Sequence, residues 1–472
     1  MRRWFPIGLS LILIVCFAAA AAGGQEFSER RELALFRLSY YGQPEPVRPG
    51  GPFVRIEVDR TRFAFEYRGT GRPSYDSLFQ NAFGAVDERI RGVFVNLGRF
   101  DVVGYPQRLR AEHVDEFIQA VREYRTEELE MPEAVMLGQQ AFTEAEFREL
   151  SGGFLVVVPS VTWYRMDYEP YDMRYTASIE TSFTVVDVDS GRSVEHFRIE
   201  TSGNSDRAEP AVQAAVDAIP SRLEYELRSL ATFRIRSGII DRDGRRIYME
   251  FGRNMGVQPG DEYAIMSTRT GRTGYTDEYE SGLIVVSDVF EQYSVGRLIY
   301  GGSSTNVGDQ LEEVPRRGAE VGAYAHMLLT PPGGGRRVEP TGAVIGLSAV
   351  ANRGFFRVRP LFALELPLTG ESDHTVIGGY LGFETSFYFG RLRVGPSLKF
   401  GGAVGDRLGD ESDPFVSHFG GKAQLGMNFQ LGRDTMLGIQ MGWMQLWRSG
   451  AAADRGIRPL AGPYIGAAVT FR

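Results

Sequence analysis

The chain has little of the side-chain chemistry that thiol and metal sites need. It contains one cysteine, Cys16, and five histidines among 472 residues. Cys16 lies within an N-terminal segment that we expect to be removed on export, which would leave no disulfide, thiolate metal site or cysteine nucleophile. No two histidines have the spacing of metal ligands, so we predict no metal and no other cofactor. The histidines are His113, His196, His326, His374 and His418.

The chain also lacks an excess of positive charge. Its 52 basic and 60 acidic residues give a formal net charge of −8, so there is no global basic field to hold nucleic acid. No Gly-x-Ser-x-Gly elbow occurs, and the glycine-rich stretch at 333–337 lacks the Lys-Ser/Thr ending of a phosphate-binding loop. Asp187 and Asp189 lie at a predicted hairpin turn, where acidic residues are common for local reasons. We therefore predict a protein that is not an enzyme and binds no nucleic acid.

Residues 1–24 have the organisation of an export signal peptide. Arg2 and Arg3 provide positive charge, residues 9–17 form an apolar run, and residues 18–22 are the small residues that a signal peptidase accepts. The run is too short for a stable membrane-spanning helix. Lipidation of Cys16 is an alternative, but the branched Val15 precedes it where such signals usually have a small residue. Residues 25–49 are interpreted as a linker.

Glycine is abundant, with 57 residues that concentrate in the last third of the chain. From about residue 318, apolar and polar residues alternate with a period of two in segments of about ten residues, which is the sequence signature of an outer-membrane β-barrel. Leu425, Met427 and Phe429, for example, fall on one face of a strand, and Lys422 and Gln424 fall on the other. We predict eight strands, at 319–330, 341–351, 355–368, 375–389, 391–404, 419–432, 435–447 and 459–472.

The links between these strands distinguish a barrel from a β-sandwich, which would also alternate. Links at 352–354, 389–391 and 432–434 are tight, whereas the other links are long and polar. Short turns on one side and long loops on the other are typical of an up-and-down barrel whose short turns face the periplasm. The segment resembles the small OmpA/OmpX-type barrels over about 155 residues. It departs from their pattern because Arg472 follows the aromatic residue that normally ends the last strand.

An eight-stranded barrel has an interior only wide enough for side chains. Charged residues on the inward face must pair or hydrate, and opposite charges in a narrow lumen can do both. We therefore predict a plugged lumen and an anchor rather than a porin. The predicted lumen charges are Arg357, Arg359, Glu365, Glu384, Arg393, Lys399 and Lys422.

Residues 50–232 alternate between strand and helix signals. They contain a strand at 53–58, a helix after Ser74, a long hairpin at 175–202 and a closing helix at 208–229. The strings LGRFDVV at 97–103, GFLVVVPSVT at 153–162 and TSFTVVDVDSG at 181–191 occur in this order. With this order the region resembles the CsgG-like family of periplasmic, outer-membrane-associated assembly proteins. The resemblance implies a role in exporting or assembling surface structures, and the shared pore of some members is not carried over.

Residues 233–315 are predicted to form a small module of short strands. The turn strings VQPGDEY at 257–263 and VGDQL at 307–311 flank the apolar strand GLIVVSDV at 282–289. In each turn, glycine permits the tight backbone and aspartate can accept a hydrogen bond from its own downstream backbone. The region resembles the small C-terminal β-barrel of the flagellar assembly protein FlgT, which implies a packing or docking module. An unrelated small β-barrel is the alternative.

One further group of residues is a candidate interface or sugar-stacking surface. It is aromatic, and ordinary strand and loop packing is the alternative interpretation. The group consists of Trp163, Tyr164, Tyr168, Tyr171 and Tyr175.

The sequence thus predicts a multidomain α+β protein of the outer membrane. A periplasmic α/β sandwich-like domain at 50–232 and a small all-β module at 233–315 precede a C-terminal eight-stranded antiparallel transmembrane β-barrel at 316–472. We expect a scaffold or assembly protein whose partners are outer-membrane lipid, periplasmic or envelope proteins and second copies of itself. The alternative is an oligomeric channel component for secretion or uptake.

Overall fold

The computed structural model describes residues 30–40, 75–109, 113–127, 134–137, 140–143, 155–272, 274–301, 305–329, 340–368, 374–407, 415–450 and 460–472. The predicted signal peptide at 1–24 and the predicted strand at 53–58 lie outside these residues. The chain divides into two compact units, and the boundary lies between Phe233 and Arg234.

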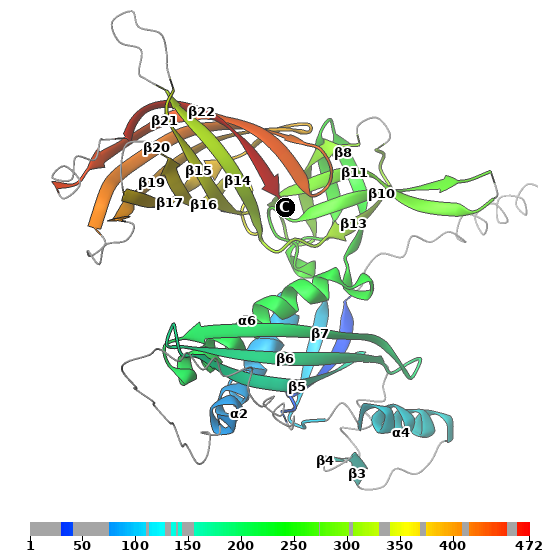
Figure 1. Cartoon of the computed structure of the whole chain (residues 1–472). Helices are drawn as coiled ribbons and strands as arrows, with labels where there is room; N and C mark the ends of the chain where they lie inside the picture. The colour runs from blue at the N-terminus through cyan, green and yellow to red at the C-terminus, as the bar shows by residue number, and fades with distance from the viewer. Residues whose placement is uncertain are drawn as a thin grey trace, which may run out of the picture. The chain divides into compact units, whose positions relative to one another are not determined.

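The first unit contains a five-stranded sheet in the order β2 (Phe100–Tyr105), β1 (Arg31–Phe36), β5 (Leu155–Glu169), β6 (Arg174–Asp187) and β7 (Arg192–Ser205) (Figure 1). Strand β1 runs parallel to both of its neighbours, and the remaining pairs are antiparallel. The prediction of a linker at 25–49 is therefore wrong for this part of the segment. Leu33, Ala34, Leu35 and Phe36 are buried, because a strand inside a sheet with both faces covered is apolar on both sides.

Helices cover both faces of this sheet. Helices α2 (Asp76–Gly84), α3 (Asp87–Asn96) and α6 (Ala208–Ser229) share a core with one face, and α4 (Val114–Glu127) shares a core with the other. The sequence predicted a single helix after Ser74, but the structure has two, because residues 85–86 interrupt the helix between α2 and α3. A short hairpin of β3 (Ala134–Leu137) and β4 (Gln140–Thr143) lies between α4 and β5 in the sequence.

The second unit begins with a closed six-stranded barrel, which we call the module. Its apolar core includes Ile247, Ile265, Ile284, Leu298 and Leu311. Around the barrel the strands are β10 (Glu262–Thr270), β11 (Thr276–Val289), β12 (Tyr293–Tyr300), β9 (Arg246–Glu250), β8 (Arg236–Asp243) and β13 (Gln310–Val314).

The second unit continues with a closed eight-stranded antiparallel barrel (Figure 1). First strand β14 pairs with last strand β22, and β17 and β18 pair with β19 as one strand interrupted at Ser386. Among the described residues, no helix has the length and apolar character to cross a bilayer. The strands are β14 (Ala319–Leu329), β15 (Pro340–Ala351), β16 (Val358–Leu368), β17 (His374–Thr385), β18 (Phe387–Phe389), β19 (Leu392–Arg407), β20 (Phe415–Gln430), β21 (Thr435–Arg448) and β22 (Leu460–Phe471).

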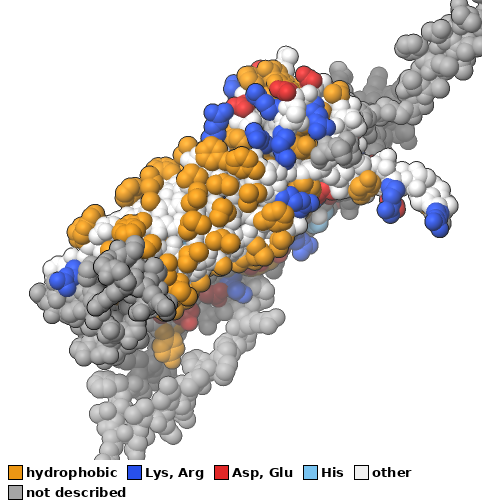
Figure 2. All heavy atoms as spheres, turned by 90° about the horizontal axis from the view of Figure 1, so that it is seen from above, with side chains coloured by type: hydrophobic (Ala, Val, Ile, Leu, Met, Phe, Trp, Pro, Cys, Tyr) orange, Lys and Arg blue, Asp and Glu red, His pale blue; other side chains and the backbone are white. Residues whose placement is uncertain are grey.

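The outer surface of this barrel is apolar. Figure 2 shows hydrophobic side chains spread over its flank with few charged side chains among them. A water-soluble protein rarely exposes a patch of this extent, whereas a barrel in a bilayer requires one. The exposed side chains include Met327, Ile345, Leu364, Leu381, Phe383, Leu398, Phe400, Phe419, Phe429, Ile439, Trp443 and Ile465.

Candidate functional site in the barrel lumen

The most prominent polar site is the interior of the eight-stranded barrel, and its first layer is centred on Glu320 of β14. The Glu320 carboxylate is fully buried and faces three arginines. Its Oε2 atom lies 3.1 Å from Nη1 of Arg359 and 2.6 Å from Nη1 of Arg393, and its Oε1 atom accepts a 3.0 Å hydrogen bond from Nε of Arg472. Glu384 of β17 pairs with the same Arg359. Charges from four strands and from Arg472 therefore close this layer across the lumen.

A second layer is centred on Glu365 of β16. Its carboxylate pairs with Lys422 and accepts a 2.8 Å hydrogen bond from the hydroxyl of Tyr324. Lys399 donates a 3.0 Å hydrogen bond to Oε1 of Gln424, and its ammonium lies 5.0 Å from the centre of the Tyr324 ring. Each of these side chains is buried, so the layer fills the lumen with paired polar groups rather than leaving an open pore.

An aromatic stack extends this second layer. The His326 ring lies between Tyr324 and Tyr464, with ring centres 4.6 Å away on each side. Its Nε2 atom is 2.7 Å from Oε1 of Gln440, and Tyr464 donates a 3.2 Å hydrogen bond to Gln424. The lumen side chains therefore hold one another in a fixed arrangement.

Arg472 joins the lumen to the module. Its side chain is buried and pairs both with Glu320 inside the barrel and with Glu262 at the start of β10. Arg316, which links the module to β14, donates to Oε2 of the same Glu262 at 2.9 and 3.0 Å and also pairs with Asp434. Burial alone would lower the pKa of Arg316, but the neighbouring Glu262 and Asp434 carboxylates raise it above its ordinary value. This ion-pair network spans the junction between the two barrels.

The short turns of the eight-stranded barrel contact the module. The β15–β16 turn donates a 2.8 Å hydrogen bond from the Gly354 N–H to the Pro259 carbonyl, and Arg353 lies 3.3 Å from Asp261. The guanidinium of Arg391, after β18, lies 4.2 Å from the centre of the Tyr300 ring. The module therefore lies against the barrel mouth that carries the tight links.

The turn at 257–263 makes the closest approach. Gly260 has a φ of +87°, and a Cβ atom there would lie 1.8 Å from the Asn352 carbonyl oxygen. Asp261 and Asp309 of the two turn strings accept hydrogen bonds from backbone N–H groups three residues upstream, whereas our prediction named downstream N–H groups. Each carboxylate therefore bonds the end of its turn to the beginning of the same turn.

The structure places six of the seven predicted lumen charges inside the barrel, and one prediction is wrong. Arg357 is exposed in the turn before β16, because that strand starts at Val358 rather than at residue 355. The prediction did not include Glu320 among the lumen charges. The apolar Val321 next to it is exposed on the outer face, so alternation places Glu320 on the inner face. The six are Arg359, Glu365, Glu384, Arg393, Lys399 and Lys422.

The aromatic group around residue 164 does not form one surface. Tyr164 is buried against Phe79 and Phe83, so the interface interpretation is wrong for this residue. Trp163 and Tyr175 are half-buried, and Tyr175 packs against Tyr168 with ring centres 4.7 Å apart. Tyr171, which is 88% exposed, lies at the turn between β5 and β6. Trp163 faces the opposite side of the sheet from Tyr164, because successive residues of a strand alternate, and Tyr171 lies outside both strands.

The described residues contain no group of three or more His, Cys, Asp or Glu side chains arranged to hold a metal ion. Scans of protein-family models and of curated proteins gave no match.

Several solved structures resemble this chain at low scores. Neisserial surface protein A (NspA) is 14% identical with a TM-score of 0.24, over 33% of this chain and 96% of that one. Ail, the attachment invasion locus protein of Yersinia pestis, is 9% identical with a TM-score of 0.22, over 32% and 96%. OmpT, an outer membrane protein of Vibrio cholerae, is 6% identical with a TM-score of 0.16, over 68% and 95%.

Proposed function

We propose that this protein is a non-enzymatic outer-membrane anchor that holds a scaffold or assembly domain in the periplasm. The observation that carries the proposal is the closed lumen under an apolar exterior. The exterior fits a bilayer, and the Glu320 layer fills an interior that is already narrow in a barrel of eight strands. Such a barrel attaches its other domains to the membrane and offers no route for a solute.

The turns support the proposed orientation of the barrel. Tight links face the periplasm in barrels of this type, and the module lies at that mouth. The first unit precedes the module in the chain, and we propose that it is periplasmic and binds envelope proteins or a second copy of the chain. In support of the CsgG-like assignment, the three quoted strings contribute to β2, β5 and β6. The closed six-stranded module is compatible with the FlgT-like assignment.

Conductance of the full chain in planar bilayers tests this proposal against the channel alternative. We expect no stable channel, because the Glu320 and Glu365 layers block the lumen. Heat-modifiable gel migration of the same preparation would verify that the barrel is folded. Stable, large conductance steps from a folded preparation would contradict the anchor and favour the oligomeric channel component.

A further inference from the structure

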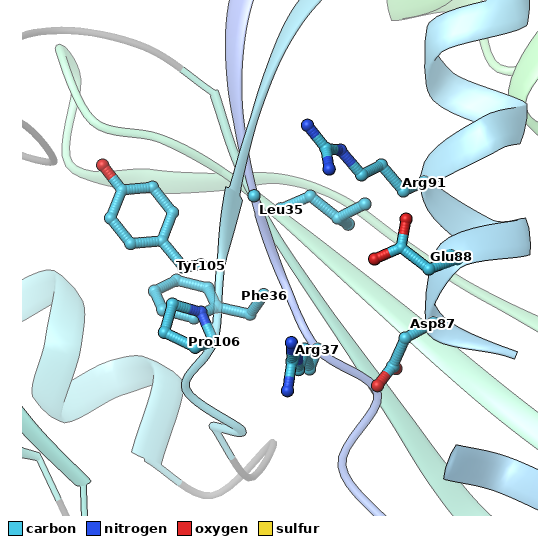
Figure 3. A pocket seen from close by; sticks show the side chains of 9 residues that line it. Leu35, Phe36, Arg37, Asp87, Glu88, Arg91, Tyr105 and Pro106 are labelled. Carbon is cyan, nitrogen blue, oxygen red and sulfur yellow. The ribbon is translucent and has the colours of Figure 1, made fainter. Parts of the chain in front are cut away.

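A small crevice in the first unit lies outside the anchor described above. It has a volume of about 130 Å³ and is lined by the first turns of α3 and by the ends of β1 and β2 (Figure 3). Strands β1 and β2 are parallel, so their carboxyl ends meet at this edge. After β1 the chain leads to α2 and α3 on one face of the sheet, and after β2 it leads to α4 on the other. Ligands of parallel α/β sheets bind where successive connections diverge in this way.

Two arginines face this crevice without partners in the part of the chain that the structure describes. Arg37 follows β1, and Arg91 extends from α3 toward the strands (Figure 3). Both side chains are exposed, and neither makes a hydrogen bond or ion pair with another described residue. The Arg91 side chain lies against β2, since a Cβ atom at Gly104 would be in ordinary van der Waals contact with it, 3.6 Å from Nε and 3.7 Å from Cζ. Each of these guanidinium groups lines the crevice and can bind an anionic group in bidentate fashion.

The acidic residues of the crevice differ in their availability. Asp87 is already engaged, since its carboxylate accepts a 2.8 Å hydrogen bond from the Leu38 N–H and a 2.6 Å hydrogen bond from Arg108. Glu88 is exposed and has no such partner among the described residues. Among the residues that the structure describes, the charges of the crevice that have no partner are thus two positive and one negative. This set matches a small zwitterion whose carboxylate and ammonium lie close together.

We propose that this crevice binds a small α-amino acid. Arg37 and Arg91 bind its carboxylate, and Glu88 accepts a hydrogen bond from its ammonium group. Because the crevice is small, the ligand is one residue in size rather than a long peptide. This binding is independent of whether the barrel conducts, so conductance and ligand binding can fail separately.

Saturation-transfer NMR on the full chain in lipid nanodiscs tests the proposal. L-alanine, acetate and ethylamine each carry a methyl group for observation, and they separate the zwitterion from the carboxylate and the ammonium alone. We expect saturable binding of L-alanine, weaker binding of acetate and still weaker binding of ethylamine. Inorganic phosphate should compete poorly. Phosphate that competes more strongly than L-alanine would overturn the assignment of a carboxylate ligand.

Substitutions test whether L-alanine binds in this crevice. We expect Arg37→Ala and Arg91→Ala each to weaken L-alanine binding about tenfold, and Glu88→Gln to reduce it to the level of acetate. Arg192→Ala, an exposed arginine at the start of β7, is the matched control and should leave binding unchanged. Thermal unfolding should be the same for all four variants, because the side chains are exposed. The proposal is wrong if L-alanine does not saturate, or if the Arg37 and Arg91 variants bind it as the unmodified chain does.

Discussion

The module and the eight-stranded barrel lie next to each other in the chain and are built inside out relative to each other. The module buries Ile247, Ile265 and Ile284 in its interior. The eight-stranded barrel buries Glu320 and Arg393 and exposes residues such as Leu381. Both use strands that place alternate residues on opposite faces, so the solvent outside each barrel decides which face is apolar.

The interiors of the two barrels have different requirements. An apolar interior only has to be filled by close-packed side chains. A charged interior must also give each charged group a hydrogen-bonding or ionic partner, because an unpaired buried charge is costly. In the eight-stranded barrel the pairs form two layers, and the first layer continues into the module through Arg472 and Glu262. Buried ion pairs therefore connect the module to the eight-stranded barrel.

The largest effect is expected when the first lumen layer loses its central carboxylate. Glu320→Gln would leave Arg359, Arg393 and Arg472 without their shared partner, and we expect the free energy of unfolding to fall by about 3–5 kcal/mol. Urea unfolding in detergent micelles, followed by heat-modifiable migration, measures this. Glu278→Gln on the exposed part of β11 is the control, with an expected change within about 0.5 kcal/mol. Equal stability of the two variants would show that the lumen charges do not depend on one another.

A charge introduced on the outer surface should destabilise the eight-stranded barrel much more than the module. Leu381 of the eight-stranded barrel and Ile240 of the module are 68% and 49% exposed. We expect Leu381→Arg to cost about 2–4 kcal/mol in a bilayer if the residue is near the midplane, because the charge enters hydrocarbon. Ile240→Arg faces water and should stay within about 0.5 kcal/mol. Refolding into lipid vesicles measures both, and a harmless Leu381→Arg would contradict the lipid-facing assignment.

The two turn glycines test the contact between the barrels. Gly260 and Gly308 both have positive φ, of +87° and +91°, but only Gly260 approaches the backbone of the β15–β16 turn. Alanine at either position strains the backbone, and we expect Gly260→Ala to cost about 1–3 kcal/mol more because the carbonyl of Asn352 cannot move aside easily. Limited proteolysis between the module and β14, compared with the stability of the two variants, measures the difference. If the two variants had the same stability and the same rate of proteolysis, the contact between Gly260 and the β15–β16 turn would not contribute to stability.

The smallest effect is expected for an exposed ion pair of the first unit, in contrast to the buried pairs of the lumen. Burial raises the pKa of Asp217, but hydrogen bonds from Arg89 and Gln213 lower it more, so its pKa lies below the ordinary value of 3.8. A lowered pKa means that the pair stabilises the fold above that value and loses this contribution as the pH falls below it. Asp217→Asn should therefore cost at most about 1 kcal/mol at neutral pH and nothing in strong acid. Thermal unfolding at several pH values and salt concentrations measures this, and a loss unaffected by salt would contradict it.

Much of the eight-stranded barrel could be predicted from the sequence because its period of two is visible in residues such as Lys422 to Gln430. Alternation also placed Glu365 and Arg393 inside. Arg357 was misplaced because Phe355 and Phe356 next to it are apolar and resemble strand residues, although they lie in the turn before β16. Strand boundaries depend on hydrogen bonds to a neighbour, which a local pattern does not contain.

The remaining features depend on contacts between distant residues. Arg472 looked like a departure from the terminal pattern, and its role requires Glu262, which lies in another barrel. Strand β1 is only six residues long and begins with Arg31 and Glu32, so its apolar residues were too few to distinguish it from a linker. The crevice at Arg37 and Arg91 exists only because β1 and β2 are parallel neighbours. Such features follow from the order of strands in a sheet and not from any one segment.

The outer-membrane location of the eight-stranded barrel is tested most directly by fractionation of cells combined with heat-modifiable gel migration. The full chain should be recovered in the outer membrane and migrate differently before and after boiling. A version that ends at Val314, after β13, should be soluble in the periplasm because it retains the module without the apolar barrel surface. A full chain that is recovered as a soluble protein without heat-modifiable migration would contradict the membrane-embedded barrel.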